Sequence, residues 1–380
     1  MTASRTVLAA SRTVLTASLT VLTASPTVLS AAPAVLAEQG RFVNAQSETR
    51  SATQGLEREM RAIAGRSGVV WAGYRAPMVA GPRQMCCGDS MGDSGACCGT
   101  CRLESGSGVT MTSDTYRDRG TRIALESPTE FLVMARFEGG QVTRVRLFTP
   151  DCNVDAGTMT VVWLTDVKPD ESIAWLSGLA RSGSDVEAQR ERVSKQAIAA
   201  IALHEVPSAD RALDAMTTPE QPDFLRSDVA FWLGSTRGDA GARRLTQMMQ
   251  QDPSEKVRDK VAFGLSVSKS SAALPALIAA AKNDRSTRVR GQALFWLAHK
   301  AGQEAVATIT NAIDHDPETE VKRKAVFALS QLPKDEGVPK LIEVARTNKN
   351  PEVRKQAFFW LGQSHDPRAI QFFEDVLLKK

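Results

Sequence analysis

Apolar residues recur every 32 residues along the carboxyl half of the chain. We call these recurring residues anchors, and a leucine follows each of them after eight residues. Val193 and Ile201 have the same spacing and lie one 32-residue period earlier. A fixed period in this range is typical of a solenoid built from repeated supersecondary units. The anchors, each followed by a basic residue, are Leu225-Arg226, Val257-Arg258, Val289-Arg290, Val321-Lys322 and Val353-Arg354.

Each unit contains two helical stretches divided by a polar turn, for example Ser271–Lys282 and Thr287–Lys300. The sequence therefore predicts a mainly α protein, with an α-solenoid of about six helix pairs over residues 170–380. The earliest pair, around Ile173–His204, keeps only part of the pattern, and we expect it to join the array to the preceding domain. Aspartate or proline marks most turns: Asp252-Pro253, Asp284, Asp316-Pro317 and Asn350-Pro351.

These turns and the helices after them resemble HEAT repeats, particularly the bacterial class related to phycobilisome lyases. The segments Asp252–Ser266, Asp316–Ser330 and Asn350–Gly362 carry the pattern, an aspartate or asparagine with proline, then Val-Arg or Val-Lys, then a spaced alanine and leucine. The resemblance implies a scaffold that binds proteins. A cysteine-rich leader before such repeats is similar to uncharacterised exported bacterial HEAT-repeat proteins.

A second regularity is a base after each anchor and, in four of five units, an acid six residues before that base. In the HEAT pattern this spacing ties the turn to the next helix and to the neighbouring repeat. A phosphate-binding stripe is the alternative, but the accompanying acids favour a structural ladder. The bases are Arg226, Arg258, Arg290, Lys322 and Arg354, and the preceding residues are Glu220, Asp252, Asp284, Asp316 and, departing from the pattern, Asn348.

A phenylalanine stands six residues after every anchor: Phe231, Phe263, Phe295, Phe327 and Phe359. At about 100° per residue these rings fall among polar neighbours, on the face that lines the concave side of a HEAT array. Five rings of roughly 150–250 Å² each exceed the usual apolar patch of a monomer, roughly 300–600 Å². Either the rings pack between neighbouring helices, as Trp232, Trp296 and Trp360 alternating with Gly264 and Ala328 suggests, or a protein partner covers them.

Residues 40–168 predict a small α+β or β-rich domain. Leu56–Ala64 has the pattern of a short amphipathic helix, and Gly68–Val79 is extended. Phe131–Phe137 and Gln141–Phe148 predict a hairpin with a bulge, joined through Glu138-Gly139-Gly140. Val161–Leu164 adds a further strand.

A glycine-rich loop over residues 81–108 of this domain contains five of the six cysteines. Cys98 and Cys101 have the spacing of half a zinc ribbon, but the adjacent Cys86 and Cys87 do not supply the other half. Structural disulfides, worth about 2–4 kcal/mol each, are the simpler interpretation, with a thiolate zinc site and thiol redox chemistry left open. The full set is Cys86, Cys87, Cys97, Cys98, Cys101 and Cys152.

Residues 1–37 repeat a seven-residue unit, TASRTVL and its variants, interrupted by Pro26 and Pro33. Arg5 and Arg12 are its only charged residues, and the segment ends in Val35-Leu36-Ala37. This pattern favours a signal peptide, and therefore an exported protein, periplasmic or secreted, whose mature chain has no integral membrane span.

The composition is that of a folded chain, with 42% hydrophobic and 24% charged residues. A net charge of +4 gives no reason to expect nucleic acid. No histidine pair has metal-ligand spacing, and no nucleophile or nucleotide-binding motif is present. The leading hypothesis is a non-enzymatic exported scaffold that needs no cofactor and holds a protein or peptide. The alternatives are a metal-binding or redox module at Cys86–Cys101, or a lyase by fold analogy alone.

Overall fold

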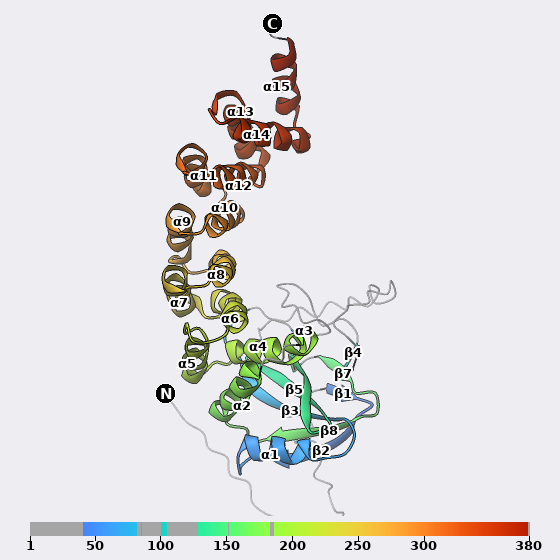
Figure 1. Ribbon diagram of the computed structural model, residues 1–380. Helices are drawn as coiled ribbons and strands as arrows, with labels where there is room; N and C mark the ends of the chain where they lie inside the picture. Colours follow the sequence, from blue (N-terminus) through green and yellow to red (C-terminus); the bar gives the residue numbers. More distant parts are fainter. Residues whose placement is uncertain are drawn as a thin grey trace, which may run out of the picture. The chain divides into compact units, whose positions relative to one another are not determined.

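In the described part of the chain, eight strands and one helix come first, and an all-helical part follows (Figure 1). The computed structural model describes residues 41–81, 85, 100–104, 128–150, 152–182 and 186–378, all within one compact unit, Gln39–Lys380. The predicted signal segment and most of the cysteine loop lie outside these residues. The amino-terminal elements are β1 Arg41–Val43, β2 Gln46–Ser51, α1 Leu56–Ala64, β3 Val70–Pro77, β4 Thr100–Arg102, β5 Glu130–Glu138, β6 Gln141–Phe148, β7 Asn153–Asp155 and β8 Thr160–Thr165.

A five-stranded mixed sheet in the order β2-β8-β3-β5-β6 forms the centre of this region. Its central strands β3 and β5 are buried along nearly their whole length, because side chains on both sheet faces are covered. Helix α1 packs against β3 and β5. A second core, including Trp71, Phe148 and Trp163, contains buried residues of the five-stranded sheet together with Val154 of the small parallel sheet β1-β7-β4.

The predicted helix at Leu56–Ala64 and the predicted hairpin are both confirmed. The connection between β5 and β6 is one residue shorter than expected, because Glu138 still pairs with Gln141. Gly139 and Gly140 therefore make the turn alone, at φ of 59° and 81°, values that glycine adopts readily. The ladder shifts register between Arg136 and Phe137, which is the expected irregularity.

The first helices after the sheet are bonded to it directly. The Val79 amide donates to the Leu203 carbonyl (2.8 Å), and the Glu205 amide donates to the Pro77 carbonyl (3.1 Å). One continuous hydrophobic core then runs from the sheet into the helical array, so the first helix pair and the sheet share their interior. These joining helices are α2 Pro169–Arg181, α3 Glu187–Gln189, a π-helical turn η2 Arg190–Ser194 and α4 Lys195–Leu203.

The remaining helices form two layers (Figure 1). The second helices of the units make an inner layer in which neighbours are in tighter contact than in the other layer, as expected for the inside of a curved array. The anchors and the leucines eight residues later are buried in every unit. The inner-layer helices are α6 Asp223–Thr236, α8 Glu255–Val267, α10 Thr287–Ala301, α12 Thr319–Ser330 and α14 Pro351–Ser364. The others are α5 Pro207–Met216, α7 Gly238–Gln251, α9 Ala273–Asn283, α11 Gln303–His315, α13 Lys334–Thr347 and α15 Pro367–Leu378.

Candidate partner-binding surface

Eight aromatic rings of the inner layer touch one another in a continuous series, which we call the aromatic strip. It contains all five predicted phenylalanines and the three alternating tryptophans. Consecutive ring centroids are between 4.7 and 5.7 Å apart. In spatial order the rings are Trp232, Phe231, Phe263, Trp296, Phe295, Phe327, Trp360 and Phe359.

The strip alternates between two kinds of step because the residue after each phenylalanine alternates in size. Where the next unit has Gly264, the rings of Phe231 and Phe263 stack directly at 17°. Where the next unit has Ala328, the rings of Phe295 and Phe327 also stack directly, with an angle of 9° between their planes. At the other steps a tryptophan contacts both phenylalanines: Trp296 contacts Phe263 and Phe295, and Trp360 contacts Phe327 and Phe359.

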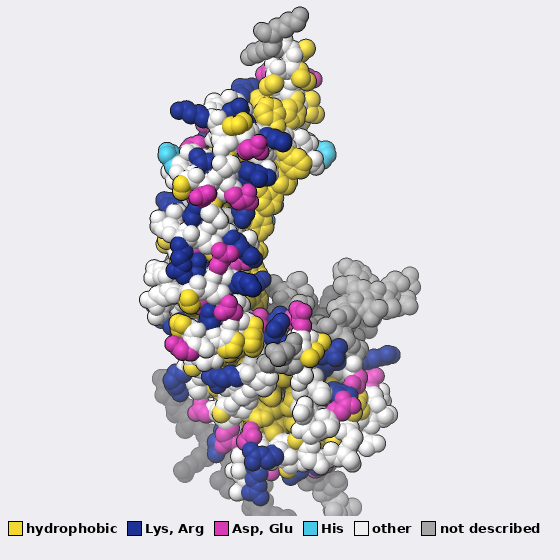
Figure 2. Space-filling model, in the orientation of Figure 1, with side chains coloured by type: hydrophobic (Ala, Val, Ile, Leu, Met, Phe, Trp, Pro, Cys, Tyr) yellow, Lys and Arg dark blue, Asp and Glu magenta, His cyan; other side chains and the backbone are white. Residues whose placement is uncertain are grey.

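The sequence left two interpretations of these rings, packing between neighbouring helices and a surface that a partner covers. Each of them describes only part of the strip. Phe231, Phe263, Phe295 and Phe327 are half-buried, so they pack on one another and still present an edge to solvent. Phe359 is the exception, at 53% exposed. Hydrophobic side chains run along the edge of the array on the inner-layer side (Figure 2). The strip is thus an apolar surface already built into the fold.

Two indole groups in the strip have unsatisfied donors. The Nε1 atoms of Trp296 and Trp360 are buried without a hydrogen-bond partner among the described residues. A buried unsatisfied donor costs about 1–3 kcal/mol. The sequence could not predict this, because the position of the indole N–H depends on how the neighbouring rings pack.

His299 extends the strip sideways, with its exposed imidazole 4.5 Å from the ring of Phe295. We did not predict it, although a spacing of four residues on one helix would have indicated the contact. Lys260 and Lys324 lie one helical turn before Phe263 and Phe327. The strip therefore has polar and cationic residues along its rim, the arrangement common at protein interfaces.

Asp228 lies one turn before Phe231 and is a poorly solvated carboxylate, with 21% of its side chain exposed. Its Oδ2 atom is buried without a hydrogen-bond partner in the described part of the chain, and Lys195 Nζ is 3.9 Å from the other oxygen. Burial raises the pKa of Asp228 to about 6, against a smaller opposing effect of the positive charge of Lys195.

The basic ladder lies inside the array. Arg258 is 2% exposed and donates through Nε and Nη2 to both carboxylate oxygens of Asp284, at 2.8 and 3.1 Å. Its Nη1 donates to the carbonyl of Asp252 in its own turn. Arg226 and Arg290 bind Asp252 and Asp316 in the same way. Each arginine therefore connects its own turn to the turn of the next unit.

The ladder changes where asparagine replaces aspartate. Asn348 cannot offer a carboxylate to Lys322, and Lys322 Nζ instead donates to the Asp314 carbonyl at 2.8 Å. Arg354 donates to the Asn348 carbonyl at 2.7 Å. Glu220, the acid that precedes Arg226, is not among its side-chain partners: the Arg226 guanidinium binds Asp223 and Asp252.

Of the cysteines, only Cys152 has a described side chain. It is fully buried in the second core and disulfide-bonded. Both ends of the cysteine loop are held beside it: the Thr149 amide donates to the Met85 carbonyl (2.9 Å), and β4 pairs with β7. The side chains of Cys86, Cys87, Cys97, Cys98 and Cys101 lie outside the described residues. Within the described residues, no group of three or more His, Cys, Asp or Glu side chains could hold a metal ion.

Tyr74, Ser172 and His204 form a hydrogen-bonded series at the junction of sheet and array. Tyr74 Oη lies 2.7 Å from Ser172 Oγ, which lies 3.0 Å from His204 Nε2. All three side chains are fully buried, and burial lowers the pKa of His204 to about 4. A substrate has no access to this series, so its role is to satisfy polar groups within the core.

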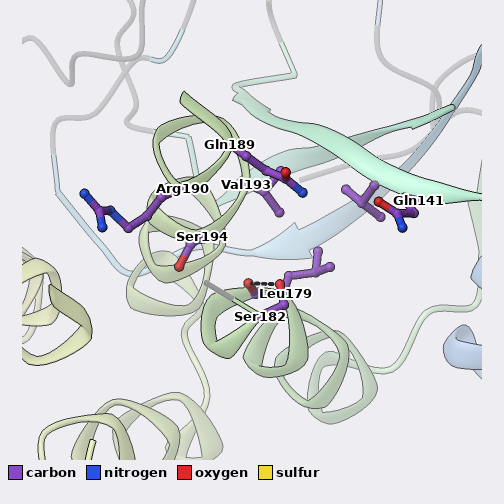
Figure 3. Close-up of a pocket in the computed structure, with 8 residues that line it drawn as sticks. Gln141, Leu179, Ser182, Gln189, Arg190, Val193 and Ser194 are labelled. Carbon is purple, nitrogen blue, oxygen red and sulfur yellow. Dashed lines mark hydrogen bonds between the residues drawn. The ribbon is translucent and has the colours of Figure 1, made fainter. Parts of the chain in front are cut away.

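A cavity of about 320 Å³ lies between the start of β6, the end of α2 and the π-helical turn (Figure 3). Its described lining contains amides, hydroxyls, aliphatic side chains and Arg190, whose guanidinium lies 5.3 Å from the centre of the Phe224 ring. Ser182 and Ser194 donate to the carbonyls of Leu179 and Ala180. None of the described lining residues is an acid, a histidine or a cysteine, so this described lining offers no group suited to acid–base catalysis.

Comparison with known proteins identifies HEAT repeats over residues 274–334 and 306–380. No curated protein matches the chain significantly. Similar solved structures include YibA of E. coli, with 22% identity, 55% of this chain and 69% of that one covered, and a TM-score of 0.32. The complex of CpcE and CpcF of phycocyanin lyase from Nostoc has 21% identity, covers 55% of this chain and 80% of that one, and has a TM-score of 0.30. Human deoxyhypusine hydroxylase in complex with glycerol has 14% identity, covers 54% of this chain and 89% of that one, and has a TM-score of 0.24. These low scores support no statement about activity.

No described helix combines the length and apolar character needed to cross a membrane.

Proposed function

Because the carboxyl part of this chain consists of HEAT repeats, we propose that the protein is a non-enzymatic scaffold that holds a protein partner along the aromatic strip. The observation that carries the proposal is the strip itself: eight touching rings along five helices that still expose their edges. Large aromatic side chains dominate binding energy at protein interfaces. A rigid set of stacked rings also loses little side-chain entropy when a partner covers it.

The proposal extends to the amino-terminal half of the chain. We propose that the protein is exported and that the cysteine loop is held by disulfides. The disulfide-bonded Cys152 supports this, together with the anchoring of both loop ends beside it. A disulfide-stapled domain would give the scaffold a second surface in an oxidising compartment.

The test must block the strip without removing its rings, because deleting a half-buried phenylalanine also destabilises the array. Gln292 and Gln356 are partly exposed and lie one turn before Phe295 and Phe359. The double variant Gln292→Glu with Gln356→Glu places two carboxylates beside the strip. Gln250→Glu with Asn311→Asp makes the same chemical change on exposed positions of the other layer and serves as the matched control.

Each purified chain is used to capture partners from extracts of the cells that produce it. We expect one protein to be retained by the wild type and the control, and to be lost from the strip variant at unchanged thermal stability. A photo-crosslinking residue at His299 should attach to that protein, whereas one at Gln250 should not. Equal capture by all three chains would place the binding surface elsewhere.

A further inference from the structure

The aromatic strip exposes the edges of its phenylalanine rings, because their faces are turned toward other rings. Each of its four half-buried phenylalanines contacts two other rings of the strip. Phe231 and Phe263 stack at 17°, and Phe295 and Phe327 stack at 9°. The edge of an aromatic ring is electrically positive and its face is negative. The part of the strip that a partner can reach is therefore apolar and weakly electropositive.

Four lysines lie beside these ring edges. They stand three, four or seven residues before a phenylalanine of the strip, spacings that share one face of a helix. Basic side chains lie next to the hydrophobic edge of the array in Figure 2. Among the described residues none of the four forms an ion pair, whereas Lys168, Lys195 and Lys340 do. The four lysines are Lys256, Lys260, Lys324 and Lys355.

The acids at the same three spacings are fewer and mostly have other partners. Four acids stand there against six cations, which are the four lysines with Arg288 and Arg323. Glu352 has no basic partner among the described residues. The other three acids form the pairs Asp259 with Arg288 (3.3 Å), Glu320 with Arg323 (3.3 Å) and Asp228 with Lys195 (3.9 Å). The surroundings of the strip therefore carry an excess of positive charge on lysines.

The fold makes room for one of these lysines beside the strip. A Cβ atom at Gly291 in α10 would lie 2.2 Å from Cδ of Lys324 in α12. The lysine stem therefore crosses to the neighbouring helix over a residue that has no side chain. Such a stem can cover apolar surface while its ammonium group stays in water. The equivalents of Gly291 in the other units all have side chains: Ser227, Asp259, Arg323 and Lys355.

We propose that the partner presents to the aromatic strip an acidic segment, in which apolar side chains are interspersed with Asp and Glu. This inference rests on the proposed scaffold function and specifies the chemistry of the partner. The apolar side chains of the segment cover the ring edges, and its carboxylates lie beside the lysines and the positive edges of the rings. Such charge complementarity speeds association and excludes partners of the wrong sign.

Other occupants fit the geometry of the strip less well. A single-stranded nucleic acid would satisfy the lysines, but it binds aromatic surfaces by stacking its bases on ring faces. In the strip those faces are turned toward other rings. A basic segment would meet the same obstacle, because cation–π contacts also use the ring face, and the lysines would repel it. The ring orientation and the charge therefore both favour an acidic protein segment.

The experiment selects peptides from a random library displayed on phage, with the full chain as bait and a photo-crosslinking residue at His299. Because His299 contacts Phe295, crosslinking retains the peptides that occupy the strip. We expect the retained sequences to be enriched in Asp and Glu together with aromatic and aliphatic residues, and depleted in Lys and Arg, relative to the unselected library.

The best retained peptide is then titrated against charge variants of the chain. Lys260→Gln with Lys324→Gln should weaken binding about tenfold at low salt, and the difference from wild type should disappear near about 1 M salt, where charges are screened beyond about 3 Å. Lys282→Gln with Lys334→Gln makes the same change at exposed positions of the other layer and should leave binding unchanged. Lys260→Gln alone, at an exposed site, covers the case in which loss of Lys324 disturbs α10 and α12.

Retained peptides that are neutral or basic would overturn this inference and leave the scaffold function standing, because they still occupy the strip. Equal binding by the wild type and both variants of the strip lysines would also overturn it. Stronger crosslinking of single-stranded oligothymidylate than of the selected peptide would assign the strip to nucleic acid instead. If no peptide attaches at position 299, the inference is wrong, and capture of a partner from cell extracts decides the scaffold function separately.

Discussion

Asp228 and Asp284 have the same side chain in very different surroundings. Asp284 accepts two hydrogen bonds from Arg258 in a pair that is almost fully buried. Asp228 is also poorly solvated, but one oxygen has no hydrogen-bond partner in the described part of the chain and its nearest cation is at 3.9 Å. Burial is therefore compensated at Asp284 and largely uncompensated at Asp228.

We predict that Asp228→Asn stabilises the protein at pH 7.5 by about 1–2 kcal/mol. The folded state raises the pKa of Asp228 from 3.8 to about 6, so the favourable contribution of its protonated form is complete below pH 3.8 and lost as the pH rises through 6. Urea unfolding at pH 7.5 and at pH 4 checks this, because the difference between variant and wild type should be near zero at pH 4. A constant difference at both pH values would contradict the assignment.

Asp284→Asn should lower stability by about 3 kcal/mol, because it leaves the buried Arg258 without its counter-charge. The exposed pair of Arg323 and Glu320, at 3.3 Å, is the comparison. Glu320→Gln should change stability by less than about 0.5 kcal/mol. Chemical denaturation of both variants at neutral pH measures the two values, and similar small losses would mean that Arg258 finds other acceptors.

At the scale of helices, two glycines at the same position of the repeat show that the room for a side chain depends on how closely the neighbouring helix approaches. Gly234 in α6 and Gly362 in α14 occupy the same place in their units, four periods apart. A Cβ atom at Gly234 would lie 2.0 Å from the carbonyl oxygen of Gly264 in α8, whereas one at Gly362 meets nothing within 4 Å. Close approach of α6 and α8 therefore requires glycine only at the first position.

Gly234→Ala should destabilise the protein by about 1–3 kcal/mol through overpacking. Gly362→Ala should stabilise it by up to about 1 kcal/mol, because alanine is the better helix former and has room. Thermal unfolding of the two variants side by side measures the difference. If both changes stabilise, α6 and α8 can separate at little cost.

At the scale of the whole described unit, the sheet and the first helix pair share one core, while α15 is covered on one side only. Opening of β3 or α4 must break that shared core, together with the bonds of Val79 and Glu205. Opening of α15 exposes few additional apolar groups, so its free energy of local unfolding is low.

Hydrogen exchange in dilute protein should therefore be slowest in β3 and α4 and fastest in α15, by at least about two orders of magnitude, or about 2.7 kcal/mol. Mass-spectrometric exchange on the intact chain, digested after quenching, measures these rates. Comparable protection of α15 and α4 in monomeric protein would show that the array opens as one cooperative unit.

The sequence by itself determined the elements that depend on local periodicity. The 32-residue lattice determined the helix pairs and the buried anchors, and alternating apolar residues with two glycines determined the β5–β6 hairpin. Tertiary structure decided what depends on distant neighbours. The stacking order of the strip and the buried carboxylate of Asp228 arise from packing between separate helices. Period and propensity act along one helix, whereas burial and ring contact depend on which helix lies beside it.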